Sequence, residues 1–322
     1  MIILLLLVSS QPGQNQGVQM KLNSTGTWQQ KSCKVETHSK GLARDTRRGP
    51  HETAISPKAF SDPMRRALLL IDIQNDFLPP HGALAVPQGD AILPCVYRLL
   101  EEGEWAVVLA SQVSSPGLWV GWNGLSSDPP RFLQDYHPPR HVSFASRWPG
   151  GKPFTSQTTQ HPRTQREIRQ ELWPDHCVQG TPGCEFERGV QERLDERRRR
   201  DGSDSCNVIQ KGIDVDLDAY SAFAVPLAEQ DTESDPAHST LARLLNDAEV
   251  EQIVVVGLAL DFCVRQSVSD AVKVREALGK QWDIVVVREG VKSVDPDQKQ
   301  LVTEDLQAQG VRFLGVQDLL PP

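Results

Sequence analysis

Long apolar runs, abundant cysteine and a surplus of basic charge are all missing from this 322-residue chain. No apolar stretch approaches the roughly 20 residues that a membrane-spanning helix needs, which argues against a membrane protein. Six cysteines in so long a sequence are too sparse for a disulfide scaffold. The 34 Lys and Arg against 42 Asp and Glu give a net charge of −8, whereas binding a phosphate backbone needs basic surface. We therefore expect a protein of enzyme size that acts neither in a membrane nor on a nucleic acid.

Residues 1–64 lack the pattern of a folded core. Seven apolar residues at positions 2–8 precede a polar stretch with little periodicity. One interpretation is a short secretion signal that is cleaved at Val8-Ser9-Ser10, and Asn23 would then begin a glycosylation acceptor. The first residues, however, carry no basic side chain. We therefore expect a cytoplasmic protein in which residues 1–64 are a disordered leader or an over-extended gene model.

From residue 65 onward, short apolar runs alternate with helical patterns. The runs are typical of strands buried on both faces and lie at residues 67–72, 105–111, 208–211, 252–258, 282–288 and 311–314. Helical patterns lie near residues 90–102, 183–200, 239–246, 261–278 and 296–309. This alternation predicts an α/β fold of three layers, in which helices cover both faces of a mainly parallel sheet. Ligands of such sheets bind beyond the carboxyl ends of the strands.

Three chemically active residues lie at these predicted strand ends. Cys263 follows the strand at 252–258 and opens a helix with Asp261 as its N-cap, where unpaired N–H groups and the helix dipole favour a thiolate. Asp72 and Lys211 each end a buried strand, so a parallel sheet could bring both beside Cys263. A lysine stabilises a thiolate, and a carboxylate moves protons for attacking and leaving groups. Singly, these residues are more often an inert core cysteine and ordinary strand-end charges. Together they predict a nucleophile for acyl transfer.

Metal-ligand residue types gather at residues 135–141. Asp135, His137 and His141 fall within seven residues, and His176 could complete a site from a distant loop. A carboxylate combined with imidazoles suits a borderline divalent ion such as Zn, with Fe or Mn as alternatives. Clusters of this kind also arise by chance in surface loops, so the spacing alone leaves both interpretations open.

Seven segments of the chain, taken in order, resemble the nicotinamidases, a family within the isochorismatase-like cysteine hydrolases. They are IDIQNDF (71–77), GALAVPQG (82–89), DYHPPRHVSFA (135–145), WPDHCVQGT (173–181), QKG (210–212), YSAF (220–223) and VGLALDFCV (256–264). The resemblance implies a single isochorismatase-like hydrolase domain over residues 65–320. It also implies that the chain hydrolyses nicotinamide to nicotinate and ammonia through a cysteine thioester, in NAD salvage.

The resemblance also assigns catalytic and metal-binding roles. It implies a catalytic set of Asp72, Lys211 and Cys263. It implies one divalent metal ion, Zn before Fe or Mn, with Asp135, His137 and His176 as ligands. His141 matches a position that in some members of the family lies at the metal, and we rank it below the other three.

Substrate contacts are implied in the same way. Phe77 and Tyr220 match aromatic positions near the substrate ring, although either alone would be interpreted as core packing. In the family the peptide that corresponds to residues 258–259 is cis. Here it would direct the N–H group of Ala259, together with that of Cys263, at the developing oxyanion.

Two other functions remain open from the sequence. A related amidohydrolase acting on another small amide or ureido compound would also need Asp72, Lys211 and Cys263. Many such relatives lack the metal residues, so the predicted metal site argues against this alternative. A non-catalytic binding protein on the same fold would have no need of all three catalytic residue types. A homo-oligomer is compatible with the sequence.

Residues 113–134 interrupt the predicted link between a strand and the first metal ligand. These 22 residues are rich in Gly, Pro and Ser and show neither a helical nor a strand period. Without them, Gln112 would join Asp135, which is the short link typical of the family. Val113 is encoded by GTN and Gln134 can be encoded by CAG, the letters that open and close an intron, so we hypothesise a retained intron. A genuine surface loop is the alternative, because doubling a loop's length adds only about 0.6 kcal/mol of closure entropy.

Overall fold

The computed structural model divides the chain into two units, Met1–Phe60 and Ser61–Pro322. It describes residues 5–6, 17–22, 28–33, 63–110, 137–162, 164–209, 211–223 and 235–320. In the first unit, three strands form an antiparallel sheet in the order β1 (Leu5–Leu6), β2 (Gly17–Leu22), β3 (Trp28–Cys33). That residues 1–64 are a leader apart from a hydrolase domain at 65–320 stays a prediction.

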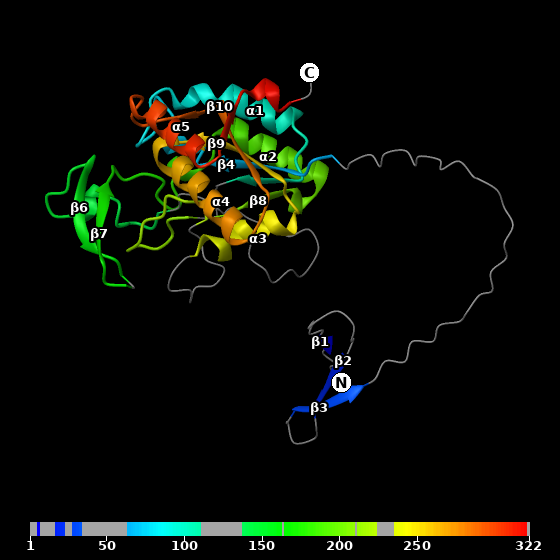
Figure 1. Cartoon of the computed structure of the whole chain (residues 1–322). Helices are drawn as coiled ribbons and strands as arrows, with labels where there is room; N and C mark the ends of the chain where they lie inside the picture. Colours follow the sequence, from blue (N-terminus) through cyan, green and yellow to red (C-terminus); the bar gives the residue numbers. More distant parts are fainter. Residues whose placement is uncertain are drawn as a thin grey trace, which may run out of the picture. The chain divides into compact units, whose positions relative to one another are not determined.

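A six-stranded parallel sheet is the middle layer of the second unit (Figure 1). Its order is β11-β10-β9-β4-β5-β8. The strands are β4 (Arg66–Ile71), β5 (Val107–Ala110), β8 (Cys206–Val208), β9 (Gln252–Leu258), β10 (Asp283–Lys292) and β11 (Arg312–Leu314). Apolar runs predict strands at all six places because both faces of a parallel sheet are covered. The run at 208–211 is corrected in one respect, since β8 ends at Val208 and Lys211 lies beyond it.

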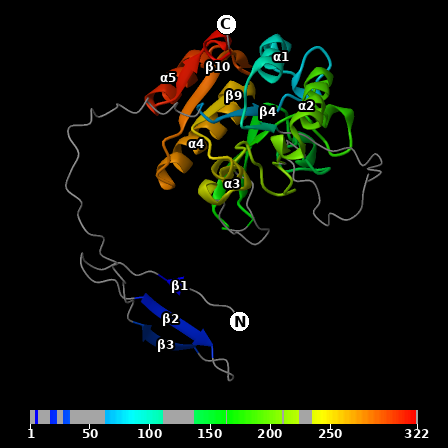
Figure 2. The same ribbon diagram turned by 90° about the vertical axis from the view of Figure 1, so that its right-hand side faces the viewer.

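Helices cover both faces of this sheet, which confirms the predicted three layers (Figure 2). One face carries α1 (Leu93–Glu102) and α2 (Arg188–Asp201); the other carries α3 (Thr240–Asp247), α4 (Arg265–Ala277) and α5 (Gln298–Ala308). Successive residues of a strand point to opposite faces. In β4, Leu68 and Leu70 accordingly pack in the core with α1 and α2, whereas Leu69 and Ile71 pack in the core with α3, α4 and α5. None of the helices in the described part of the chain is long and apolar enough to cross a membrane.

A separate hairpin, which the sequence pattern does not predict, projects beside the main sheet (Figure 1). Its antiparallel strands are β6 (Thr155–Gln160) and β7 (Glu167–Leu172). β6 contains no apolar residue and is mostly exposed, so it lacks the alternation by which a half-buried strand is recognised.

Residues 111–136 follow β5 and lie outside the described residues. They include the predicted insertion at 113–134 and the predicted metal ligand Asp135. The chain is described again from His137, which pairs with Val178 in an isolated bridge.

Candidate active site

The carboxyl ends of β4 and β9 form the floor of the site. These two strands are parallel neighbours, and their register sets Ile71 beside Gly257. Asp72 follows β4 directly and turns the chain with a φ of 48°, a left-handed conformation that is uncommon for a residue other than glycine. Cys263 lies in one turn of π-helix, Leu260–Val264, between β9 and α4. Both side chains therefore lie at the edge of the sheet where ligands of such folds bind.

Lys211 joins these two residues. Its Nζ lies 2.9 Å from Oδ2 of Asp72, and both side chains are fully shielded from solvent. The same Nζ lies 3.5 Å from Sγ of Cys263 and 3.4 Å from the carbonyl oxygen of Ala219, so it can donate to both. The structure thus brings together the three residues that the sequence predicts as a catalytic set.

Asp261 does not have the role that the sequence predicts for it. It lies inside the π-helical turn, and its carboxylate accepts hydrogen bonds from the backbone N–H groups of Val294 and Asp295, both at 2.9 Å. The turn begins one residue after Ala259, too early for Asp261 to be its N-cap. Through these hydrogen bonds, the carboxylate connects the segment after β10 to the turn that carries Cys263.

The peptide between Leu258 and Ala259 is cis, as the family resemblance implies. Ala259 and Cys263 both line the pocket described next. The oxyanion-binding role of their N–H groups stays a prediction.

A small, mainly aromatic pocket opens beside the thiol of Cys263. Its lining contains both predicted aromatic residues, Phe77 and Tyr220. The complete lining is Phe77, Leu84, Val86, Trp173, His176, Tyr220, Ala259, Phe262, Cys263 and Val294. With one thiol, one imidazole and one phenol among apolar surfaces, the pocket suits a small planar molecule with few polar atoms.

Trp173 and Phe262 are pocket residues that the sequence reasoning missed. The indole Nε1 of Trp173 donates to the hydroxyl of Tyr220 at 3.0 Å, and its ring meets that of Phe262 edge to face at 5.1 Å. Burial, reinforced by the charge of Asp218, raises the pKa of Tyr220 well above its usual value, so the phenol stays protonated. Sequence signals for both residues exist, because Trp173 opens the segment that contains His176 and Phe262 immediately precedes Cys263.

Three histidines gather next to this pocket. The ring of His137 stacks on that of His141, with centroids 3.9 Å apart, and meets the ring of His176 edge to face at 4.9 Å. All three side chains are buried. Nδ1 of His137 lies 3.1 Å from the carbonyl oxygen of Gly212, and Nδ1 of His176 lies 2.7 Å from that of Pro174. A ring that donates from Nδ1 carries its lone pair on Nε2, which is the usual arrangement of a metal-binding histidine.

The electrostatics of the histidines also fit a metal site. Burial lowers the pKa of all three, and for His137 the neighbouring His141 and His176 add to the effect. Neutral imidazoles are the form that binds a metal ion. Both nitrogens of His141 face protein oxygens, the hydroxyl of Ser143 at 2.7 Å and the carbonyl of Leu217 at 3.4 Å. Its rank below the other predicted ligands stays a prediction.

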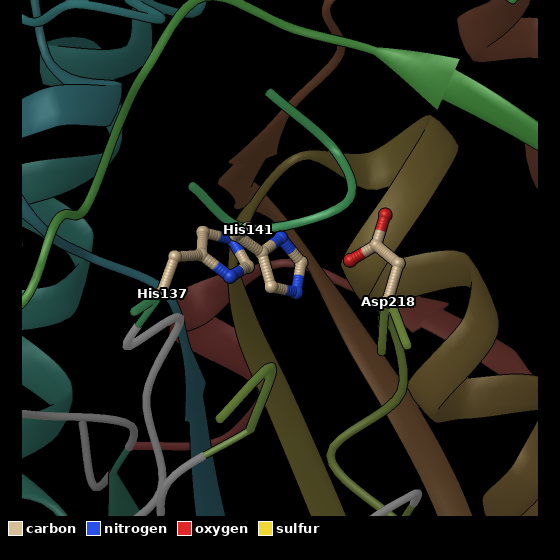
Figure 3. A group of neighbouring side chains, drawn as sticks. All are labelled: His137, His141 and Asp218. Atoms are coloured by element: carbon tan, nitrogen blue, oxygen red, sulfur yellow. The ribbon is translucent and has the colours of Figure 1, made fainter. Parts of the chain in front are cut away.

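Asp218 is a further carboxylate at this cluster, which the sequence reasoning missed. Ligand atoms of His137, His141 and Asp218 all lie within 4.8 Å of one another (Figure 3). Nitrogen and carboxylate donors together suit a borderline divalent ion, so the residues present fit a metal. The sequence signal for Asp218 is its position two residues before Tyr220. Since Asp135 lies outside the described residues, the predicted ligand set of Asp135, His137 and His176 stays a prediction.

The chain is similar to known nicotinamidases and pyrazinamidases. The isochorismatase domain model matches residues 218–318. A nicotinamidase of Escherichia coli K12 is 32% identical over 232 residues, which cover 71% of this chain and 84% of that protein. A nicotinamidase/pyrazinamidase structure from Acinetobacter baumanii is 28% identical with a TM-score of 0.56, over 81% of this chain and 100% of that one. The pyrazinamidase of Pyrococcus horikoshii, solved in complex with zinc, is 26% identical with a TM-score of 0.50, over 78% and 99%.

The fold and the buried Asp–Lys–Cys set define an isochorismatase-like enzyme that hydrolyses an amide. Within this superfamily, the chain belongs to the nicotinamidase family.

Proposed function

We propose that this protein hydrolyses nicotinamide to nicotinate and ammonia. The observation that carries the proposal is the contact of Lys211 with both Asp72 and Cys263 at the edge of a small aromatic pocket. Relatives that are named nicotinamidases support the choice of substrate. The product would return to pyridine nucleotide biosynthesis, so we place the reaction in cytoplasmic NAD salvage.

The pocket suits the substrate in polarity. Nicotinamide is a planar, uncharged ring with one carboxamide, and the pocket walls are mostly aromatic or apolar. We expect the ring to lie against Phe77 and Tyr220 with its carboxamide toward Cys263. His176 lines the same pocket and would face the pyridine nitrogen.

The chemistry would proceed in two steps. First, Sγ of Cys263 attacks the carboxamide carbon while Asp72 takes the thiol proton, and this proton then leaves with ammonia as the C–N bond breaks. Second, water attacks the resulting thioester; Asp72 takes a proton from this water, and nicotinate leaves as the thiol re-forms. The ammonium of Lys211 stabilises the thiolate and the charge of Asp72 throughout. The N–H groups of Ala259 and Cys263 would stabilise the oxyanion that forms in each step.

A divalent metal ion is part of the proposal, with Asp135, His137 and His176 as its ligands and zinc as the first candidate. When bound, it would supply a Lewis acid to the pyridine nitrogen and so fix the position of the ring. The buried, neutral histidines support a metal at this place. A related hydrolase of another small amide would not need it.

An assay for nicotinate and ammonia with metal-loaded protein tests the proposal. We expect turnover by the wild type and none by Cys263→Ala, which should still bind nicotinamide because the ring is held by other groups. Mass spectrometry of the quenched wild-type reaction should find an acyl group on Cys263. An inactive metal-loaded wild type would refute the function. A fully active enzyme without metal would favour the related amidohydrolase.

A further inference from the structure

We propose that Phe154, at the start of the β6–β7 hairpin, is a positioning residue that holds the indole of Trp173 in the wall of the aromatic pocket and so sets the affinity for substrate. This inference rests on the proposed function and extends it to a residue outside the seven motif segments. The rings of Phe154 and Trp173 meet edge to face, with centroids 5.9 Å apart. Aromatic pairs favour this geometry at separations of about 4.5–7 Å.

Two features of Phe154 are unfavourable for an ordinary surface residue. Its side chain is 65% exposed, although it is large and apolar. Its backbone has a φ of 63°, a left-handed conformation that is uncommon for a bulky residue. Backbone conformations of this kind persist where the surrounding structure enforces them, and they cluster at functional sites. The contact with Trp173 supplies a reason for both features.

The register of the hairpin places the two rings together. Thr155 pairs with Leu172, and the backbone N–H of Phe154 donates to the carbonyl oxygen of Leu172 at 2.7 Å. Phe154 therefore lies just before the last pair of the ladder, and Trp173 lies just after it on the other strand. The hairpin thus connects Phe154 to the pocket wall through its own hydrogen bonds.

The backbone of Trp173 is held separately from its ring. Its N–H donates to Ser143 and its carbonyl oxygen accepts from Ala145, both at 2.8 Å. These bonds fix the main chain but leave the side-chain torsions of the tryptophan free. Contacts of the indole must therefore determine where the ring lies.

Three aromatic side chains contact this indole. Phe262 meets it edge to face at 5.1 Å, the hydroxyl of Tyr220 accepts from its Nε1 at 3.0 Å, and Phe154 is the third. Trp173, Tyr220 and Phe262 line the pocket, and Phe154 is the one of the four that does not. Loss of the Phe154 ring should let the indole move and weaken its hydrogen bond to Tyr220, so two pocket walls would loosen together.

The rival explanation is that Phe154 is a surface residue, or a docking residue for another protein, with no effect on the pocket. Phe154→Ala removes the ring, whereas Phe154→Tyr keeps it and should restore the function. Leu301→Ala is the matched control, because Leu301 on α5 is an apolar side chain of similar exposure, 61%. Since Phe154 is mostly exposed, these variants should fold; Phe154→Leu, which keeps an apolar side chain without the ring, is the second variant if Phe154→Ala does not.

The first test measures nicotinamide binding and turnover by the zinc-loaded, full-length chain. In a Cys263→Ala background, titration calorimetry should show that Phe154→Ala raises the Kd by about 3- to 10-fold, the range that one aromatic pair supplies. In the active enzyme, KM should rise by a similar factor. Because Asp72, Lys211 and Cys263 lie at strand ends and in the π-helical turn, kcat should change by less than about 2-fold.

Phe154→Tyr and Leu301→Ala should change neither Kd nor KM by more than about 2-fold. An unchanged Kd in Phe154→Ala would overturn the proposal. So would a fall in kcat without a change in KM, because that result would place the effect of Phe154 on the chemistry and not on the pocket wall.

A second test needs no substrate. Cys263 lines the same pocket, so the rate at which the bulky reagent N-phenylmaleimide modifies it reports how open the pocket is. Peptide mass spectrometry should show faster modification of Cys263 in Phe154→Ala than in the wild type, Phe154→Tyr and Leu301→Ala. Equal rates in the wild type and Phe154→Ala would also overturn the proposal. If the wild type binds no nicotinamide, only the proposed function fails, and the maleimide rates still decide the role of Phe154.

Discussion

Lys211 and Asp72 form an ion pair whose members are both fully shielded from solvent. A buried charge that loses its partner costs about 3–5 kcal/mol, whereas two neutral residues of similar size cost little. We therefore expect Lys211→Met to lower the free energy of unfolding by about 3–5 kcal/mol and to abolish turnover. Urea unfolding followed by circular dichroism measures the first effect.

The double variant Asp72→Asn, Lys211→Met is the control for this prediction. It leaves no unpaired charge, so it should recover most of the lost stability and none of the activity. If the double variant were as unstable as Lys211→Met, the loss would come from packing and not from charge.

The cysteines of the second unit should differ in reactivity. Burial raises the pKa of Cys95 to about 12, so only about 1 in 10,000 of its side chains is a thiolate at pH 8. Burial also raises the pKa of Cys184 and of Cys206. Cys263 lines the pocket and lies 3.5 Å from the Lys211 ammonium, which favours the anion.

Limited alkylation with iodoacetamide at pH 8 should therefore modify Cys263 before Cys95, Cys184 and Cys206, as peptide mass spectrometry can show. Removing the ammonium in Lys211→Met should slow the modification of Cys263. Equal labelling of Cys95 and Cys263 in the folded protein would contradict the prediction.

At the scale of elements, the contact between β4 and β9 depends on one glycine. Gly257 has a φ of 132°, and a Cβ there would lie 1.9 Å from the carbonyl oxygen of Ile71. Gly257→Ala should force the two strands apart beside Asp72 and lower the free energy of unfolding by at least about 3 kcal/mol.

Gly279→Ala is the matched comparison. Gly279 also has a positive φ, of 61°, but a Cβ there would meet nothing within 4 Å. Its cost should be the backbone preference alone, about 1 kcal/mol. Thermal unfolding of the two variants side by side measures the difference, and equal melting temperatures would show that β4 and β9 can separate without loss.

The sequence predicts the strands of the main sheet because both of their faces are buried, and it predicts the helices because one face of each packs on the sheet. Prediction from apolar patterns fails for elements that bury few apolar residues. The hairpin of β6 and β7 has polar strands, and the end of β8 is not marked by any change in hydrophobicity. Asp72, Lys211 and Cys263 could be predicted because parallel strand ends meet at one edge. Asp218 was missed because it approaches the histidines from a loop whose course no periodicity encodes, and only its position two residues before Tyr220 indicates it.

At the scale of the whole chain, the predicted insertion at 113–134 bears on metal binding and turnover. The retained-intron hypothesis predicts that deletion of these residues, which joins Gln112 to Asp135, tightens metal binding and raises turnover. The physical reason is that a short link would restrict Asp135 to the neighbourhood of the end of β5, whereas a longer link would add conformational entropy that metal binding must overcome. Zinc affinity and steady-state kinetics of the two proteins compare the forms.

Sequencing the transcript across the codons for residues 112–135 tests the retained-intron hypothesis directly. A single mRNA species that contains the segment would defeat the intron interpretation. Weaker metal binding by the deletion variant would mean that residues 113–134 contribute to the metal site.

The order of strands in the sheet has a consequence for synthesis on the ribosome. β4 is made early, yet one of its two neighbours, β9, pairs Gln252 with Arg66, 186 residues further along the chain (252 − 66). At 5–20 residues per second, β4 must wait about 10–40 s for that partner. Until then, one edge of a strand that is apolar from Ala67 to Ile71 is open to other chains and to chaperones. Because Cys263 follows β9, the nucleophile cannot meet Asp72 until 263 of the 322 residues have been made.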